Sequence, residues 1–162
     1  MYLKSLDCNL IPFIKNKSIY YCENDPNRIV KGFTDLKKMD AEYTMHWRAQ
    51  SIVPCPKILE TVYENHAGYI VMERIKGKTI YDVYGSDEYG MPSSIWVQIH
   101  SIIYRLFAND IHYEDVTPFN FMIEDNTGKI YILDFGHAYE KKVNWFLKEF
   151  LDGENTWNSD FA

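Results

Sequence analysis

Residues 112–136 read HYEDVTPFNFMIEDNTGKIYILDFG, and this stretch decides the fold that we expect. A polar loop is followed by two short apolar runs, and residues 125–128 (DNTG) between these runs are a strong hairpin turn. A hairpin returns its second end close to its first, so we expect Asp115, Asn120 and Asp134 to converge at one mouth of the sheet. Each residue alone is a common turn former, but the order and spacing of the three favour a functional site.

The side chains of this set indicate a divalent-metal site. Carboxylate and amide oxygens are hard ligands, which Mg²⁺ accepts while it keeps waters and binds phosphate oxygens. Asp134 and Asn120 are therefore the candidate metal ligands. Asp115, close to that metal, is the carboxylate that can orient or deprotonate a hydroxyl group.

The same stretch resembles the protein kinases. Residues 112–120 are similar to the catalytic loop H-R-D-x-x-x-x-N, and residues 132–136 to the strand that leads into D-F-G. Upstream, residues 28–31 (RIVK) resemble the kinase strand V-A-I-K, and residues 69–77 resemble the strand and hinge that join the kinase lobes. The resemblance covers roughly Arg28 to Tyr139.

This resemblance implies an α+β, two-lobed protein kinase-like fold with a truncated C-lobe. A strand-rich N-lobe with one helix would span residues 1–75, and a reduced helical C-lobe with the catalytic loop would span residues 76–162. The brevity of the chain suggests the minimal, atypical members: the RIO kinases, the small kinase of the KEOPS complex, or compact viral and bacterial-effector kinases. Aminoglycoside phosphotransferases share the fold and are the next neighbours.

The resemblance also implies a set of nucleotide contacts, with ATP and Mg²⁺ as the cofactors. Lys31 matches the catalytic lysine that holds the α- and β-phosphates, and Glu42 matches the helix glutamate that pairs with it. Adenine would bond to backbone groups of Glu73 and Ile75, with Met72 as a wall of the pocket. Taken alone, Lys31 also fits a solvated strand lysine. Glu42 also fits an ordinary exposed helix residue, because its separation of 11 positions from Lys31 is shorter than in conventional kinases.

The phosphate-binding loop departs from the kinase pattern. Gly32 is the first glycine in the chain, so no glycine-rich loop precedes the strand that resembles V-A-I-K. Glycines let backbone N–H groups approach phosphates closely. Residues 11–18 occupy the place of that loop, and Lys15, Lys17 and Ser18 are the alternative phosphate contacts within it.

The catalytic loop and the C-terminal part depart as well. Tyr113 and Glu114 stand where the family has His and Arg, so we expect no phosphate-controlled switch at this loop. Thr117 replaces the usual catalytic-loop lysine. Only 26 residues follow Gly136, and none form A-P-E. Substrate must therefore be held in some other way, or by a partner.

Hydrophobic periodicity predicts the remaining elements. The expected helices span residues 35–50, 92–107 and roughly 141–151, and the expected strands span residues 9–14, 18–22, 28–33, 57–63, 68–72, 121–124 and 129–133. Thr34 or Asp35 would cap the first helix, and Ser93 or Ser94 the second. The apolar face of the first helix would carry the series Leu36, Met39, Tyr43 and Trp47.

Composition limits the classes of partner. Lys and Arg number 17 against 23 Asp and Glu, a net charge of −6, which argues against a protein built mainly to bind nucleic acid or anionic membranes. The three cysteines are widely spaced, and we interpret them as buried free thiols in a reducing compartment. No signal peptide or apolar run of bilayer length is evident, so a soluble, cytoplasmic protein is expected.

Three functional hypotheses remain open. The first is an active atypical kinase that transfers the γ-phosphoryl group of ATP to a protein Ser or Thr, with a protein substrate or regulatory partner. The second is a pseudokinase, a nucleotide- or partner-binding module, which the missing glycine loop supports and the set of Asp115, Asn120 and Asp134 opposes. The third is a small-molecule phosphotransferase, which the missing peptide platform supports.

Overall fold

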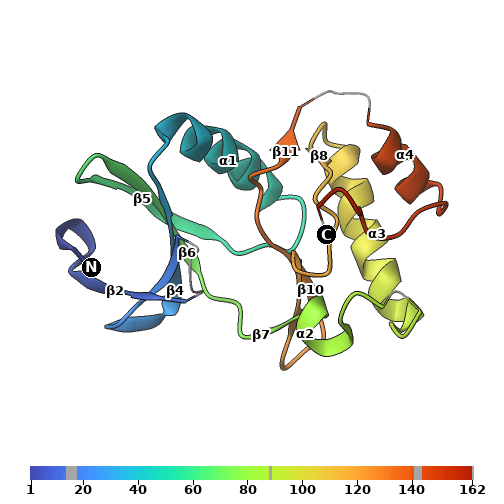
Figure 1. Cartoon of the computed structure of the whole chain (residues 1–162), viewed down its shortest axis with the longest axis horizontal. Helices are drawn as coiled ribbons and strands as arrows, with labels where there is room; N and C mark the ends of the chain where they lie inside the picture. The colour runs from blue at the N-terminus through green and yellow to red at the C-terminus, as the bar shows by residue number, and fades with distance from the viewer. Residues whose placement is uncertain (14–17, 88, 141–143, 162) are drawn as a thin grey trace.

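The fold begins with a six-stranded antiparallel sheet. A computed structural model describes residues 1–13, 18–87, 89–140 and 144–161. The strand order is β1-β2-β3-β4-β6-β5, and Figure 1 shows this sheet at one end of the molecule. The strands are β1 (Tyr2–Leu3), β2 (Cys8–Pro12), β3 (Ile19–Cys22), β4 (Asp25–Phe33), β5 (Ile58–Glu64) and β6 (Ala67–Glu73), with a short 3₁₀ turn, η1 (Lys4–Leu6), after β1.

Helix α1 (Leu36–Ala49) packs against this sheet. The Asp35 side chain caps the helix by accepting hydrogen bonds from the backbone N–H groups of Lys37 and Lys38. Of the two predicted caps, Thr34 and Asp35, the second is therefore confirmed. Gly68 of β6 makes the close approach possible, because a Cβ at this position would lie 2.2 Å from the Sδ of Met39.

The predicted apolar face of α1 is wrong in part. Met39 is buried as expected, but Leu36 and Trp47 are exposed. The buried face instead carries Glu42 and His46 beside its apolar residues. The helix is thus rotated so that two polar side chains point inward, which hydrophobic periodicity alone does not predict.

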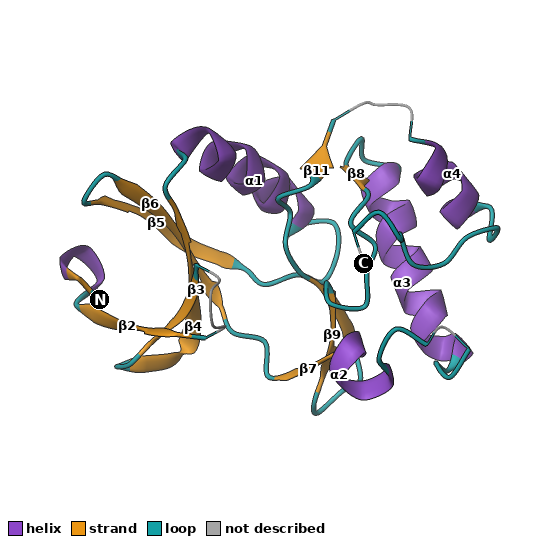
Figure 2. Ribbon diagram, viewed as in Figure 1, coloured by secondary structure: helices purple, strands orange, loops and turns teal. Residues whose placement is uncertain are grey.

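Beyond this sheet and α1, the described residues form two small sheets and three further helices. Strands β7 (Gly77–Thr79), β9 (Phe121–Glu124) and β10 (Ile130–Ile132) form a sheet of order β10-β9-β7, and β8 (His112–Tyr113) pairs with β11 (Ala138–Tyr139). The helices are α2 (Ile80–Tyr84), α3 (Ser93–Phe107) and α4 (Trp145–Leu151). Figure 2 shows α3 and α4 at the end of the molecule opposite the six-stranded sheet.

Most predicted elements are confirmed within a few residues, and two details are corrected. No serine caps α3, because its N-cap is Pro92, which makes no side-chain hydrogen bond. The short elements β1, β7, β8, β11 and α2 were not predicted, since two to five residues carry too little periodicity. The last helix is described from Trp145, and residues 141–143 of its predicted range lie outside the described residues.

The largest hydrophobic core lies around α3. Ile99, Ile103 and Leu106 on its inner face are fully or almost fully buried. They belong to one cluster with Phe121 of β9 and Phe135, the residue directly after Asp134. The core therefore holds the hairpin and the segment after it against α3, which fixes the position of the polar residues at the hairpin's ends.

The cysteines differ from the expectation of three free thiols. Cys8 and Cys22 form a disulfide, because the β2–β3 hairpin brings their Cα atoms within 5.6 Å of each other. Cys55 is free and buried, as predicted. Among the helices of the described residues, we find none with the length and apolar character that a membrane span requires.

Candidate functional site

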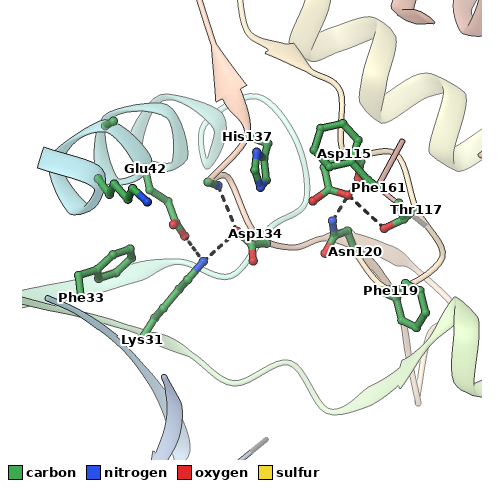
Figure 3. A pocket seen from close by; sticks show the side chains of 13 residues that line it. Lys31, Phe33, Glu42, Asp115, Thr117, Phe119, Asn120, Asp134, His137 and Phe161 are labelled. Atoms are coloured by element: carbon green, nitrogen blue, oxygen red, sulfur yellow. Dashed lines mark hydrogen bonds and ion pairs between the residues drawn. The ribbon is translucent and has the colours of Figure 1, made fainter. Parts of the chain in front are cut away.

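The centre of the site is a network of two ion pairs around one lysine. Lys31 Nζ lies 2.7 Å from Glu42 Oε1 and 2.8 Å from Asp134 Oδ1 (Figure 3). The three side chains come from β4, α1 and the segment after β10. The sequence-predicted pairing of Lys31 with Glu42 therefore forms, despite the short separation of the two residues along the chain.

Local structure explains this convergence. Val30 is buried on one face of β4, so the alternation of a strand turns its neighbour Lys31 toward the other face. Asp134 has a left-handed backbone (φ 53°), which Asp tolerates better than most residues. The N–H of Gly136 donates to Asp134 Oδ1 at 3.1 Å, and a Cβ at Gly136 would lie 3.2 Å from oxygens of both Asp134 and Glu42. A residue without a side chain is thus suited to this position.

Burial and charge set the protonation of the network. Burial raises the pKa of Glu42 to about 6, against the opposing attraction of Lys31. Burial also acts to raise the pKa of Asp134, but Lys31 and the Gly136 N–H outweigh it, and that pKa is lowered. The two carboxylates raise the pKa of Lys31 in spite of its burial. At neutral pH the network therefore holds one cation between two anions.

The catalytic-loop residues lie beside this network. The Asn120 Nδ2 group donates to the backbone carbonyl of Asp115 at 3.1 Å, and the Thr117 hydroxyl donates to Asp115 Oδ1 at 3.3 Å. The backbone N–H of Leu133 donates to the carbonyl of Asn120 at 2.8 Å, which joins the loop to the residue before Asp134. Burial raises the pKa of Asp115, as suits a carboxyl group that accepts a proton.

A cavity of about 680 Å³ lies at this place, and the residues predicted to converge from the hairpin geometry all line it. Its wall contains the three convergent residues Asp115, Asn120 and Asp134 (Figure 3). Lys31 and Glu42 complete the polar part of this wall.

A second, smaller cavity of about 190 Å³ adjoins the first. The three residues that the resemblance assigns to adenine, Met72, Glu73 and Ile75, all line it. Lys31 and Asp134 line both cavities, so the two share part of their walls. A mainly apolar recess therefore lies beside a charged one.

Hard oxygen atoms at the junction fit a magnesium ion. The Asn120 Nδ2 group is occupied by Asp115, and Figure 3 shows the amide oxygen of Asn120 turned toward Asp134. One amide oxygen and one carboxylate suit a cation that takes its other ligands from water and phosphate. The described residues contain no group of three or more His, Cys, Asp or Glu side chains placed to hold a metal by themselves.

The catalytic loop has a further anchor that sequence reasoning missed. The Glu114 carboxylate accepts hydrogen bonds from the Tyr139 hydroxyl at 2.9 Å and from the Asn144 side-chain amide. Asn144 in turn caps α4 through its Oδ1 atom. Glu114 stands where the kinase catalytic loop has an arginine. It therefore connects this loop to the segment after Gly136 through hydrogen bonds with neutral groups.

Two aromatic contacts were also missed. His46 of α1 stacks on Phe135 at 4.8 Å between ring centroids, and its Nε2 lies 2.7 Å from the carbonyl of Pro56. Burial lowers the pKa of His46 to about 4, so this ring is neutral at physiological pH. Phe119 stacks on Tyr81 at 4.2 Å and lines both cavities. No spacing in the sequence links either pair.

Part of the predicted phosphate loop lies outside the described residues. Lys15 and Lys17 fall in the segment 14–17. The carbonyl of Ser18 accepts a hydrogen bond from Gly32 N at 2.7 Å. Phe13, directly before the segment, lines the smaller cavity.

The sequence of this chain matches the model of a known protein family. The family model of the ABC1 atypical kinase-like domain matches residues 37–152, a range that includes Glu42, Asp115, Asn120 and Asp134 and begins after Lys31. The match supports an atypical kinase-like family and does not single out the RIO, KEOPS-complex or compact viral and effector kinases. A search of curated proteins found no match. Because the model covers more than half of its length, the chain belongs to the ABC1 atypical kinase-like domain family.

Proposed function

We propose that this protein is an ATP-dependent phosphotransferase that carries the γ-phosphoryl group of Mg·ATP to a protein Ser or Thr. The observation that carries the proposal is the network of Lys31, Glu42 and Asp134 at the junction of the two cavities. In this proposal the nucleotide lies between an N-lobe of residues 1–75 and a C-lobe of residues 76–162.

The smaller cavity would hold the adenine. Met72 and Ile75 supply apolar walls, and backbone groups of Glu73 and Ile75 are the hydrogen-bonding partners that the resemblance assigns. Lys31, which lines both cavities, is placed to contact the α- and β-phosphates. Glu42 holds the ammonium group in position and is itself only 5% exposed.

Asp115 would be the catalytic base. Its carboxylate orients the acceptor hydroxyl and takes the proton as the new bond between the acceptor oxygen and the γ-phosphorus forms. The bond from that phosphorus to the bridging oxygen breaks, and ADP carries the electron pair away. The hydrogen bond from Thr117 restrains the Asp115 carboxylate, and the bond from Asn120 restrains its backbone.

Asp134 and Asn120 would hold the metal ion. When bound, Mg²⁺ neutralises charge on the transferring phosphoryl group. The chain contributes a lowered Asp134 pKa, which keeps this carboxylate ionised, and an amide oxygen already oriented by Asp115.

An assay of phosphoryl transfer tests the proposal. With radiolabelled ATP, Mg²⁺ and dephosphorylated casein as a general acceptor, wild type should label protein. Asp115→Asn and Asp134→Asn should each lower the rate, by on the order of a thousandfold for the metal carboxylate. Asp125→Asn, at the exposed hairpin turn, is the matched control and should behave as wild type.

The alternatives give different results in the same assay. A pseudokinase, favoured by the absence of glycine before Gly32, would bind nucleotide and show no transfer in any variant. A small-molecule phosphotransferase would label a small acceptor and no protein. The protein-kinase proposal is wrong if wild type and Asp115→Asn label protein equally.

A further inference from the structure

We propose that the segment 157–161 forms the acceptor-side wall of the larger cavity, with Phe161 as the residue that shields Asp115 from bulk water and helps select the acceptor. The inference rests on the proposed function, because it assigns a specificity role at the same site.

The first anchor of this segment is Trp157. Its ring packs 4.6 Å from Trp96 of α3 and 6.2 Å from Phe121 of β9, measured between ring centroids. Trp157 thus joins the main hydrophobic core. The start of the segment is held by the same packing that positions the hairpin of the site.

The second anchor is Asn158, which is only 5% exposed. Its backbone N–H donates to the carbonyl of Val116 at 2.8 Å, and its Nδ2 group donates to the carbonyl of Glu114 at 2.7 Å. Glu114 and Val116 are the two neighbours of Asp115 along the chain. The segment is therefore hydrogen-bonded to the catalytic loop on both sides of the proposed base.

A tight turn then brings Phe161 to the cavity. The N–H groups of Asp160 and Phe161 donate to the side-chain and backbone oxygens of Asn158, at 3.1 and 3.2 Å. The Phe161 ring lies 5.0 Å from that of His137 in an edge-to-face contact. Both rings line the larger cavity together with Asp115 (Figure 3).

This placement has a chemical consequence. Phe161 adds apolar surface to the wall that Asp115 shares, and it does not line the smaller cavity assigned to adenine. An apolar wall beside a general base disfavours water as the acceptor and favours a hydroxyl carried by a substrate that fills the space. Loss of the ring should therefore raise hydrolysis of ATP by water and leave the recognition of adenine unchanged.

The test compares Phe161→Ala with wild type in steady-state release of ADP from Mg·ATP without an added acceptor. Phe161→Ala should raise kcat for hydrolysis severalfold with an unchanged KM for ATP, and should lower the ratio of casein labelling to hydrolysis. The series Phe161→Leu, Phe161→Val and Phe161→Ala should raise hydrolysis in that order, so the test stands if the alanine variant fails to fold. Trp145→Ala, at an exposed aromatic of α4, is the matched control and should change neither quantity.

The possible failures are distinguishable. If wild type neither binds nor hydrolyses Mg·ATP, the proposed function is overturned, and the wall with it. If wild type binds and hydrolyses ATP but folded Phe161 variants release ADP at its rate, only the wall is overturned. A rise in KM for ATP that matches the change in kcat also overturns it, because Phe161 would then contact the nucleotide. Adding Asp115→Asn to Phe161→Ala should abolish the gain in hydrolysis.

Discussion

Glu42 shows how a single residue can make the site depend on pH. Its pKa of about 6 means that acidification protonates it and removes one of the two anions around Lys31. For stability the sign is opposite: a raised folded-state pKa contributes stability that is present below about 4.5 and lost as the pH rises through about 6. Taken by itself, ionisation of Glu42 therefore opposes folding at neutral pH, whereas the raised pKa of Lys31 and the lowered pKa of Asp134 favour it.

The pH dependence of nucleotide binding follows from this protonation. Affinity of wild type for Mg·ATP should fall as the pH drops through about 6, because protonated Glu42 no longer holds Lys31. Glu42→Gln should bind more weakly at pH 7.5 and lose the inflection near pH 6, while Glu154→Gln, an exposed glutamate, should keep the wild-type profile. Titrations followed by isothermal calorimetry measure both, and a wild-type affinity that is flat from pH 7.5 to 5 would contradict the assignment.

Residue by residue, the sequence predicted the polar site better than its surroundings. Asp115, Asn120 and Asp134 were predicted to converge from hairpin geometry alone, and they line one cavity. Lys31 and Glu42 were assigned only through the resemblance to kinases. Contacts that join distant segments, such as Asn158 to the catalytic loop, leave no periodic signal and could not be predicted.

At the scale of elements, the contact between α1 and β6 positions Glu42. A methyl group at Gly68 would lie 2.2 Å from the Sδ of Met39, so the buried Met39 side chain, and with it the helix that carries it, would be displaced from the sheet. We expect Gly68→Ala to lower the free energy of unfolding by about 1–3 kcal/mol, the usual cost of overpacking. It should also weaken nucleotide binding, since Glu42 moves with the helix.

Denaturant unfolding and calorimetry of the same samples test both effects. Gly90→Ala is the matched control, because a Cβ there would meet only the carboxylate end of Asp87, at 3.2 Å. If Gly68→Ala unfolds and binds nucleotide as wild type does, the close contact between Gly68 and Met39 does not hold the helix in place.

The sequence predicted elements where one period dominates and failed where polar side chains are buried. Strands β2 to β6, β9 and β10 and helix α3 were predicted within a few residues because their apolar residues follow a single period. The face of α1 was wrong because Glu42 and His46, both polar, point inward and occupy buried positions. A cap such as Asp35 was predictable because it depends on a short side chain next to the helix start.

At the scale of the whole molecule, a chain of an atypical kinase-like family carries a charged cavity that shares wall residues with an apolar one. The sequence carried the general family through the loop and the Asp-Phe-Gly strand, both of which lie inside the matched residues. The sequence did not identify the subfamily of atypical kinases, because the length of the chain was the only guide to it. The pairing of Cys8 with Cys22 was likewise not predictable, since it depends on the β2–β3 register.

The central claim is that Lys31, held by Glu42 and Asp134, binds the phosphates of Mg·ATP, and calorimetric titration of Mg·ATP into wild type, Lys31→Met and Lys37→Met tests it most directly. Lys37 is an exposed lysine at the start of α1 and serves as the control. We predict that wild type and Lys37→Met bind alike, and that folded Lys31→Met binds roughly tenfold to a hundredfold more weakly, the value of a hydrogen bond to a charged group. Equal affinity in all three proteins, or no binding by wild type, would contradict the account.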